Sequence, residues 1–144
     1  MASRDIHNKL HFVPLIPPVA ARTDNTAIVS SIIDTAGFES IEFVLVTGTN
    51  TDTNATFAVT VDEGDASDLT GSNAVAANQL IGTTTLAGFT FADDNECRKI
   101  GYVGGKRYVR LTVTPSGNDS GNIFVAGVAV LGNARSAPTA NPPQ

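Results

Sequence analysis

The chain of 144 residues contains no tryptophan, one cysteine and two histidines. A single cysteine excludes an intrachain disulfide, and Cys97 is expected to be an inert thiol at a strand edge. The histidines, His7 and His11, have the i, i+4 spacing of half a zinc site, but no cysteine or carboxylate cluster completes a ligand set and both precede the strand-forming region. We therefore expect no catalytic residue, no metal ligand and no cofactor-binding residue.

Glycine is absent from residues 1–36, which decides the meaning of "SIIDTAGFESIEF" at residues 31–43. The D-T-A-G string followed by glutamate is typical of a small-GTPase switch, and such a switch needs a glycine-rich phosphate loop upstream. The Gly-Gly-Lys at 104–106 lies downstream and has Ile100 where the first loop glycine would be needed. The segment is therefore interpreted as two strands joined by a turn, in which Gly37 supplies a positive φ.

Positive charge is also scarce, with nine Lys and Arg against 14 Asp and Glu and a net charge of −5. The one basic group, "KRYVR" at 106–110, lies inside a strand pattern. Nucleic acid and anionic membranes both require clustered basic residues, so neither is an expected partner. The chain also lacks an apolar run of about 18 residues and an N-terminal apolar signal region. We therefore expect neither a membrane span nor a signal peptide.

Acidic residues gather in "DEGDASD" at 62–68, where Asp62, Glu63, Asp65 and Asp68 could offer oxygen ligands to calcium. The spacing differs from that of an EF-hand loop, because Gly64 falls in the wrong place. A solvated hairpin loop is the expected structure, with calcium binding as the weaker alternative.

From residue 26 onward, short segments of alternating or continuous apolar character are separated by polar turns. The predicted strands lie at 27–34, 40–47, 55–64, 88–94, 98–104, 106–115 and 122–132. This pattern predicts an all-β domain, a β-sandwich or a jelly-roll-like barrel. Phe43, Val59, Leu111 and Val125 are expected to face inward. The segment 122–132 is apolar on both faces and is predicted to be a central strand buried on both sides, forming a long hairpin with 108–114.

The sequence suggests three regions: an extended N-terminal arm at 1–22, a β-sandwich domain at 23–132, and a flexible or disordered tail at 133–144. Three prolines exclude a helix through the arm, yet the arm is rich in apolar residues. We expect these side chains to contact another protein subunit: Ile6, Leu10, Phe12, Val13, Leu15 and Ile16. The alternative, an arm packed on its own domain, remains open.

Three segments carry a resemblance to a known group of proteins: "RTDNTAIVSSIIDTAGFESIEFVLVTGTNTDTNATFAVTVDEGD", "FADDNECRKIGYVGGKRYVRLTVTP" and "VAGVAVLGNARSAP". The chain resembles the capsid decoration, or cement, proteins of tailed bacteriophages over about residues 5–138, through overall character and not through a catalytic motif. The resemblance implies a β-rich homo-oligomer that is assembled in the bacterial cytoplasm and binds the major capsid protein on the outside of the expanded shell.

Two other roles in the virion are compatible with the same sequence. One is a head–tail completion or tail structural protein, although tail-tube proteins usually contain a long helix and this sequence shows none. A weaker alternative is a glycan-binding virion module, for which a chain with no Trp and two Tyr is poorly supplied. An enzyme is not expected.

Overall fold

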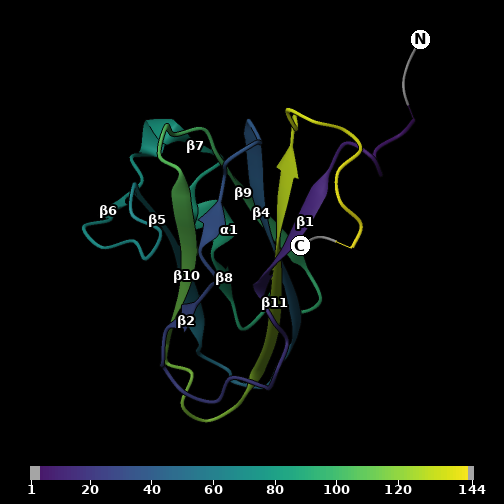
Figure 1. Ribbon diagram of the computed structural model, residues 1–144. Coiled ribbons are helices and arrows are strands. Elements are labelled where there is room, and N and C mark those ends of the chain that lie inside the picture. The colour runs from purple at the N-terminus through teal and green to yellow at the C-terminus, as the bar shows by residue number, and fades with distance from the viewer. Residues whose placement is uncertain (1–3, 143–144) are drawn as a thin grey trace.

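The computed structural model describes residues 4–142 and consists of two antiparallel sheets packed face to face (Figure 1). Sheet A has the strand order β1 (His11–Ile16), β11 (Ile123–Gly132), β4 (Ser40–Asn50), β9 (Cys97–Tyr102), β7 (Leu80–Ile81). Sheet B has the order β2 (Ile28–Val29), β10 (Tyr108–Ser116), β5 (Thr56–Gly64), β6 (Asn73–Ala74), with β3 (Ile33–Asp34) also paired to β10 and β8 (Phe89–Thr90) to β5. The expected all-β sandwich is confirmed.

Over residues 4–142, helical structure is limited to two short turns between β6 and β8. The 3₁₀ turn η1 spans Ala77–Gln79, and α1 spans Thr84–Ala87. The side chain of Thr83 caps α1 by accepting a hydrogen bond from the Leu86 amide at 3.1 Å. This small helix contacts both β5 and β9, so it lies at the open edge between the two sheets.

The core lies between the sheets and is built from alternate residues of the long strands. The four side chains expected to face inward do so, since Phe43 and Leu111 have no exposed surface and Val59 and Val125 are 3% and 5% exposed. Each sits on a strand whose next residue faces outward, as the period of two requires. The expected orientation of these four residues is therefore confirmed.

The expected hairpin between residues 108–114 and 122–130 is wrong. Strand β10 pairs with β5 in sheet B, and β11 pairs with β4 in sheet A. The connection between them crosses from one layer to the other and is anchored by the fully buried Asn118, whose side-chain amide donates to the carbonyl oxygens of Arg22 and Asp24 at 3.2 and 3.0 Å. Those bonds hold the connection against the loop before β2 instead of allowing a tight reversal.

The first expected strand, 27–34, is divided into β2 and β3, which both pair with β10. Between them Ser30 donates its backbone N–H to Leu111 O at 3.0 Å, while its hydroxyl accepts the Leu111 N–H at 3.1 Å. The turn that follows is closed by Phe38 N–H to Thr35 O at 3.0 Å, and Gly37 has the expected positive φ, +89°. This turn leads from sheet B to sheet A and does not close a hairpin.

The N-terminal region is not a separate arm along its whole length. Residues 11–16 form β1, an edge strand paired with β11, and both Leu15 and Ile16 are buried in the core of their own chain. An isolated arm and an edge strand share the same extended backbone, and proline is tolerated at a sheet edge, so Pro14 did not distinguish the two. Burial of the two aliphatic side chains favours the edge strand. The expected boundary at residue 22 is therefore wrong.

The described part of the C-terminal segment, 133–142, is not a free tail. Arg135 N–H donates to Gly37 O at 2.9 Å, Thr139 N–H donates to Asn8 O at 3.0 Å, and the Thr139 hydroxyl donates to Leu10 O at 2.6 Å. These bonds hold the segment against the turn after β3 and against the turn at residues 6–10 that precedes β1.

A polar bridge joins the two sheets at one end of the sandwich. The Tyr102 hydroxyl on β9 donates to the Glu63 carboxylate on β5 at 2.5 Å and accepts the Lys106 N–H at 2.9 Å. Burial of the ring and the neighbouring carboxylate raise the pKa of Tyr102 well above its usual value. The backbone of Gly104 passes against this ring, because a Cβ added at Gly104 would lie 2.4 Å from the Tyr102 hydroxyl oxygen.

The core assignment predicts a large effect for Phe43→Ala, which removes a ring with no exposed surface. We expect the free energy of unfolding to fall by about 3–5 kcal/mol, measured by chemical denaturation. Thr60→Ala, on the outer face of sheet B, is the control and should change it by less than about 0.5 kcal/mol. Similar losses for both variants would contradict the assignment of faces.

Two adjacent glycines provide a second prediction. A methyl group at Gly104 would clash with the Tyr102 ring, whereas one at Gly105 would meet no atom within 4 Å. Gly104→Ala should therefore destabilise the fold by about 1–3 kcal/mol, and Gly105→Ala should leave stability nearly unchanged. Equal melting temperatures for the two variants would show that the ring does not hold its position.

Candidate interaction surface

The outer face of sheet A carries an unusual number of apolar side chains for a surface. They come from β1, β11 and β4, and the larger ones are Phe12, Phe124, Val128, Val130, Val44 and Val46. The strand register places Phe12 opposite Val130, and Val128 opposite Val44. The side chains therefore form one continuous apolar surface, which we call the outer face of sheet A.

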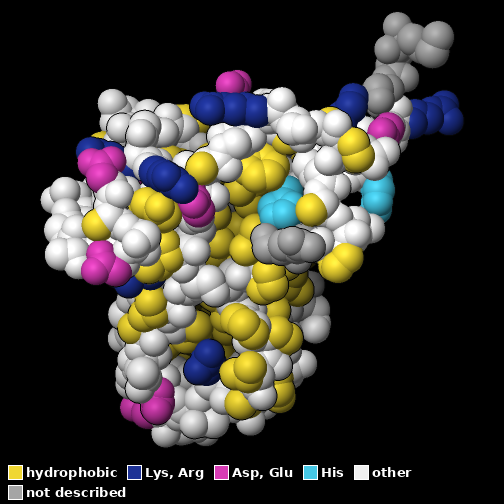
Figure 2. Space-filling view, viewed as in Figure 1, with side chains coloured by type: hydrophobic (Ala, Val, Ile, Leu, Met, Phe, Trp, Pro, Cys, Tyr) yellow, Lys and Arg dark blue, Asp and Glu magenta, His cyan; other side chains and the backbone are white. Residues whose placement is uncertain are grey.

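Several members of this surface are substantially exposed. Phe124 is 53% exposed, Phe12 46%, Val46 45% and Val128 37%. Figure 2 looks toward the side of the sandwich, where hydrophobic side chains show in the middle of the view and charged side chains gather mainly around its upper and left parts. An exposed apolar patch of this kind, bounded by polar residues, is typical of a protein interaction site.

The outer face of sheet B has the opposite character. Its outward residues on β5 and β10 are mostly polar and include four threonines, with Thr60 opposite Thr112, and Asp62 opposite Arg110 at an ion-pair distance of 3.7 Å. This is the polar, solvated face that an antiparallel sheet usually presents to water. The two layers therefore share one core but have different outer surfaces.

One side of the apolar surface is polar and balanced in charge. Glu42 and Lys99 lie there, together with the exposed thiol of Cys97. The Glu42 carboxylate lies over Gly101, where an added Cβ would be 2.7 Å from Oε2. Partial burial raises the pKa of Glu42, and the positive charge of Lys99 opposes that shift. The surface thus carries one charge of each sign, although the whole chain carries −5.

Of the six side chains expected to contact another subunit, the structure leaves Ile6 and Phe12 the most accessible. Ile6 is 67% exposed, Leu10 is half-buried, and Val13 packs against the core. Because Leu15 and Ile16 are buried in their own domain, they are not available to a partner. Only Phe12 joins the outer face of sheet A, and a role for Ile6 stays a prediction.

The sequence interpretation missed Val44, Val46, Phe124 and Val128 as candidate contact residues. Their signal was present, because β4 and β11 are apolar at both odd and even positions. We predicted that 122–132 would be buried on both sides, and β11 is indeed inside its sheet. The prediction is wrong for the outer side, since a sandwich of two layers covers only the inner face of each sheet.

The four acidic residues of the 62–68 loop do not converge on one point. Asp62 pairs with Arg110, Glu63 accepts from Tyr102, Asp65 pairs with Lys106 at 2.5 Å, and Asp68 accepts from Thr70 at 2.8 and 2.9 Å. Within residues 4–142 no group of three or more His, Cys, Asp or Glu side chains is placed to hold a metal ion. The loop therefore uses its carboxylates for local structure.

The two histidines have different partners. The His11 ring stacks on Phe38 with a centroid separation of 5.3 Å. His7 is exposed, and its Nε2 lies 3.4 Å from the Asn141 amide nitrogen. These contacts help to hold the segment before β1 against the turn after β3 and the C-terminal segment.

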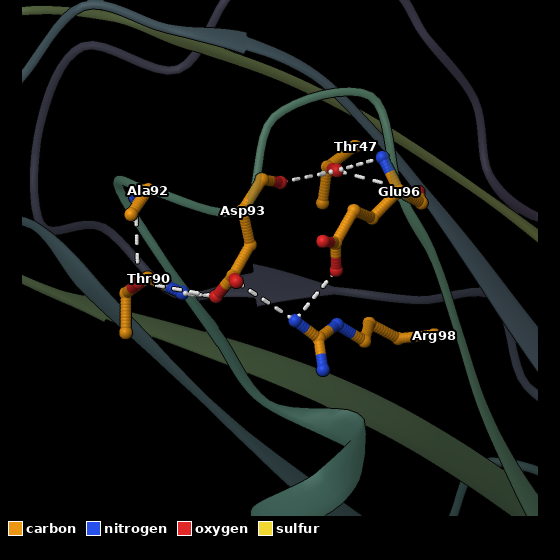
Figure 3. A network of polar contacts seen from close by, with 6 residues as sticks. All are labelled: Thr47, Thr90, Ala92, Asp93, Glu96 and Arg98. Atoms are coloured by element: carbon orange, nitrogen blue, oxygen red, sulfur yellow. Dashed lines mark hydrogen bonds and ion pairs between the residues drawn. The ribbon is translucent and has the colours of Figure 1, made fainter.

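A polar network fixes the loop between β8 and β9 (Figure 3). The Arg98 guanidinium contacts Asp93 at 2.9 Å and Glu96 at 2.7 Å through Nη2. Asp93 also accepts the Thr90 N–H at 2.7 Å, which is the main cause of its lowered pKa. Thr47 completes the network by donating its hydroxyl to Asp93 O at 2.7 Å and accepting the Glu96 N–H at 3.0 Å.

An open cavity of about 490 Å³ lies beside this network and is lined by β5, α1, β8 and Arg98. Threonine side chains line it together with Phe57 and Phe89, which stack at 4.7 Å between centroids. The charge of Arg98 is balanced by its two carboxylate partners. The arrangement offers neither a nucleophile paired with a base nor an uncompensated charge, so we assign the network a structural role.

Asp34, the aspartate of the D-T-A-G string, forms a two-point ion pair with Arg107. Its Oδ1 and Oδ2 accept from Nε and Nη2 at 2.9 and 2.8 Å, and Oδ1 also accepts the Ala36 N–H at 2.9 Å. The bond from Arg107 is the largest cause of the lowered pKa of Asp34. The carboxylate thus holds β3 to the start of β10 and closes the turn that follows.

Comparison with known proteins adds little to this description. No family model matches the chain, and no curated protein matches it. Among solved structures, it is similar to the Clostridium thermocellum xylanase 10B CBM22-1–GH10 modules complexed with xylohexaose, at 16% identity and a TM-score of 0.42. The match covers 76% of this chain but 19% of that chain. The likeness is too remote to support an argument about function.

A search for membrane spans is also negative. Over residues 4–142, no helix has the length and the apolar character needed to cross a membrane.

Because the Asp34 carboxylate is held in the ion pair with Arg107, we predict that the chain does not bind guanine nucleotides. Isothermal titration of GTP with magnesium should give no binding heat, for the wild type and for Asp34→Ala alike. Micromolar binding by the wild type that disappears in Asp34→Ala would show that the string is a true switch motif.

Proposed function

We propose that this chain is a structural virion protein that binds the outside of an expanded phage capsid and stabilises the shell. The observation that supports this proposal most strongly is the outer face of sheet A, a continuous apolar surface that is exposed in the single chain and would be covered in an assembly. It adds to the resemblance of the sequence to capsid decoration proteins. Both features are typical of a protein whose role is to be buried in an assembly.

The physical requirement for such a role is contact area and not chemistry. A protein that binds the expanded shell better than its precursor stabilises the expanded state by mass action. Burial of apolar surface contributes about 25 cal/mol per Å², so exposed Phe and Val side chains provide a driving force for association.

The polar side chains of the domain agree with a structural role. Asp34, Glu63 and Arg98 are the groups that could have suggested chemistry, and each is held in a contact within the chain. Asp52, which is 2% exposed, accepts the backbone N–H groups of Asn54, Asp119 and Ser120 at 3.0–3.2 Å. These interactions rigidify the loops at the two ends of the sandwich, and a rigid surface loses little entropy on binding.

The main alternative, a head–tail completion or tail protein, differs in stoichiometry. A decoration protein covers the lattice, so its copy number follows that of the major capsid protein. A neck or tail protein is present as one ring or a few rings per particle. The proposed glycan-binding module receives no specific support from the residues that the structure describes.

The proposal predicts that this chain is abundant in purified phage particles, in proportion to the major capsid protein. Quantitative mass spectrometry of the particles measures the ratio. Particles that lack the chain should release their DNA at a lower temperature, and adding the purified chain should restore the wild-type temperature. A copy number that fits a single ring, or equal binding to expanded and precursor shells, would contradict the decoration role.

A further inference from the structure

We propose that the outer face of sheet A is covered by the same face of a second copy of this chain, in a two-fold symmetric dimer. This inference rests on the proposed function for its biological setting, but the dimer is a property of the purified chain and can be tested without capsids.

The size of the surface fits a modest dimer interface. Four strands, β1, β11, β4 and β9, span about 15–20 Å at a spacing of about 4.8 Å, and nine residues of β4 span about 30 Å. The projected area is therefore roughly 500 Å², and the accessible area of the side chains is larger. A typical stable interface buries about 800 Å² on each partner. The outer face of sheet A is therefore somewhat smaller than a typical stable interface, which predicts a reversible, concentration-dependent dimer.

The shape and charge of the surface suit pairing with itself. A two-fold interface requires a patch that is complementary to its own copy. The centre of this patch consists of small aliphatic side chains, and Phe124 lies against Gly48, where an added Cβ would be 3.0 Å from the Phe124 Cβ. Glu42 and Lys99 give the patch one charge of each sign. Two chains of net charge −5 can therefore meet here without an excess of like charge.

Pairing through the edge of sheet A is less favourable than pairing through its face. At the exposed edge of β1, Pro14 has no N–H to donate to an added strand. The Leu15 carbonyl already accepts the Ser31 N–H at 3.0 Å. Since the β1 edge is blocked at two successive residues, we do not expect a second copy to extend the sheet at this edge.

The dimer would leave other exposed apolar side chains free. Ile6 and Val19 are 67% and 76% exposed and lie outside the outer face of sheet A. Ile6, which is one of the side chains expected to contact another subunit, and Val19 therefore remain available for a contact with the capsid lattice. Self-association and capsid binding would therefore use different surfaces.

The test compares two lysine substitutions in sedimentation equilibrium of the purified chain. Val46→Lys places a charge within the outer face of sheet A, and Thr60→Lys places the same charge on the outer face of sheet B. We expect a dimer with a micromolar dissociation constant for the wild type and for Thr60→Lys. Val46→Lys should weaken the dimer by about 100-fold or more, because the lysine would be buried without a partner. Thermal unfolding checks that both variants fold.

The single thiol provides a readout that does not depend on any substitution. Cys97 is exposed and lies opposite Val46 on the same face. Its rate of reaction with a maleimide should fall as the wild-type concentration rises through the dissociation constant, and it should not fall for Val46→Lys. If Val46→Lys does not fold, protection of Cys97 in the wild type decides the question.

Several results would overturn the inference. These are a wild-type chain that stays monomeric at high micromolar concentration, dimers that persist in folded Val46→Lys, or dimers lost only in Thr60→Lys. A monomer that still binds expanded capsids would refute the dimer and leave the proposed function intact. A chain that dimerises in solution but is absent from phage particles would contradict the proposed function and leave the dimer intact.

Discussion

A sandwich of two sheets can cover only the inner face of each sheet, and this constraint explains which side chains of the molecule are buried and which are exposed. In β5 and β10 the sequence obeys it, with Val59, Val61, Leu111 and Val113 inside and threonine outside. In β4 and β11 it does not, because both alternating sets are apolar. The inner set, which includes Phe43 and Ala129, completes the core. The outer set has no counterpart within residues 4–142, and for this reason we propose that a second copy covers it.

Polar side chains hold the layers together where the strands end. Tyr102 and Glu63 join the sheets at one end, while Asp52 and Asn118 fix the loops at the other. Glycine is required at these points because the backbone comes close to its partner, as at Gly121, where an added Cβ would lie 2.4 Å from the Asp52 amide nitrogen. Buried polar groups of this kind are costly unless they are hydrogen-bonded. For this reason, several charged residues that could suggest chemistry in the sequence are held in hydrogen bonds and ion pairs within the chain.

The sequence was sufficient for the fold class and for the inward residues, because a period of two fixes which side chains share a face. It was not sufficient for strand pairing. The period is the same whether β10 pairs with β11 or with β5, and the choice depends on long-range contacts such as those of Asn118 with Arg22 and Asp24. The same limit applies to residues 11–16, because an arm and an edge strand have identical local preferences. The apolar outer face was visible as a pattern in β11, but only the arrangement of layers reveals that this side is uncovered.

An exposed apolar sheet is an aggregation hazard, and the fold limits it in a specific way. Open-ended association of β proteins usually proceeds through free edges, and here the edge of β1 is closed by Pro14 and by the bond from Ser31 to Leu15. The exposed face, in contrast, can pair with the same face of one other chain. A two-fold contact of this kind is closed, so it leaves no free apolar face to which a third chain could add. A chain that blocks its β1 edge and pairs through one apolar face would favour a finite complex over a growing one. That combination is what a small subunit needs if it must stay soluble until it reaches a much larger assembly.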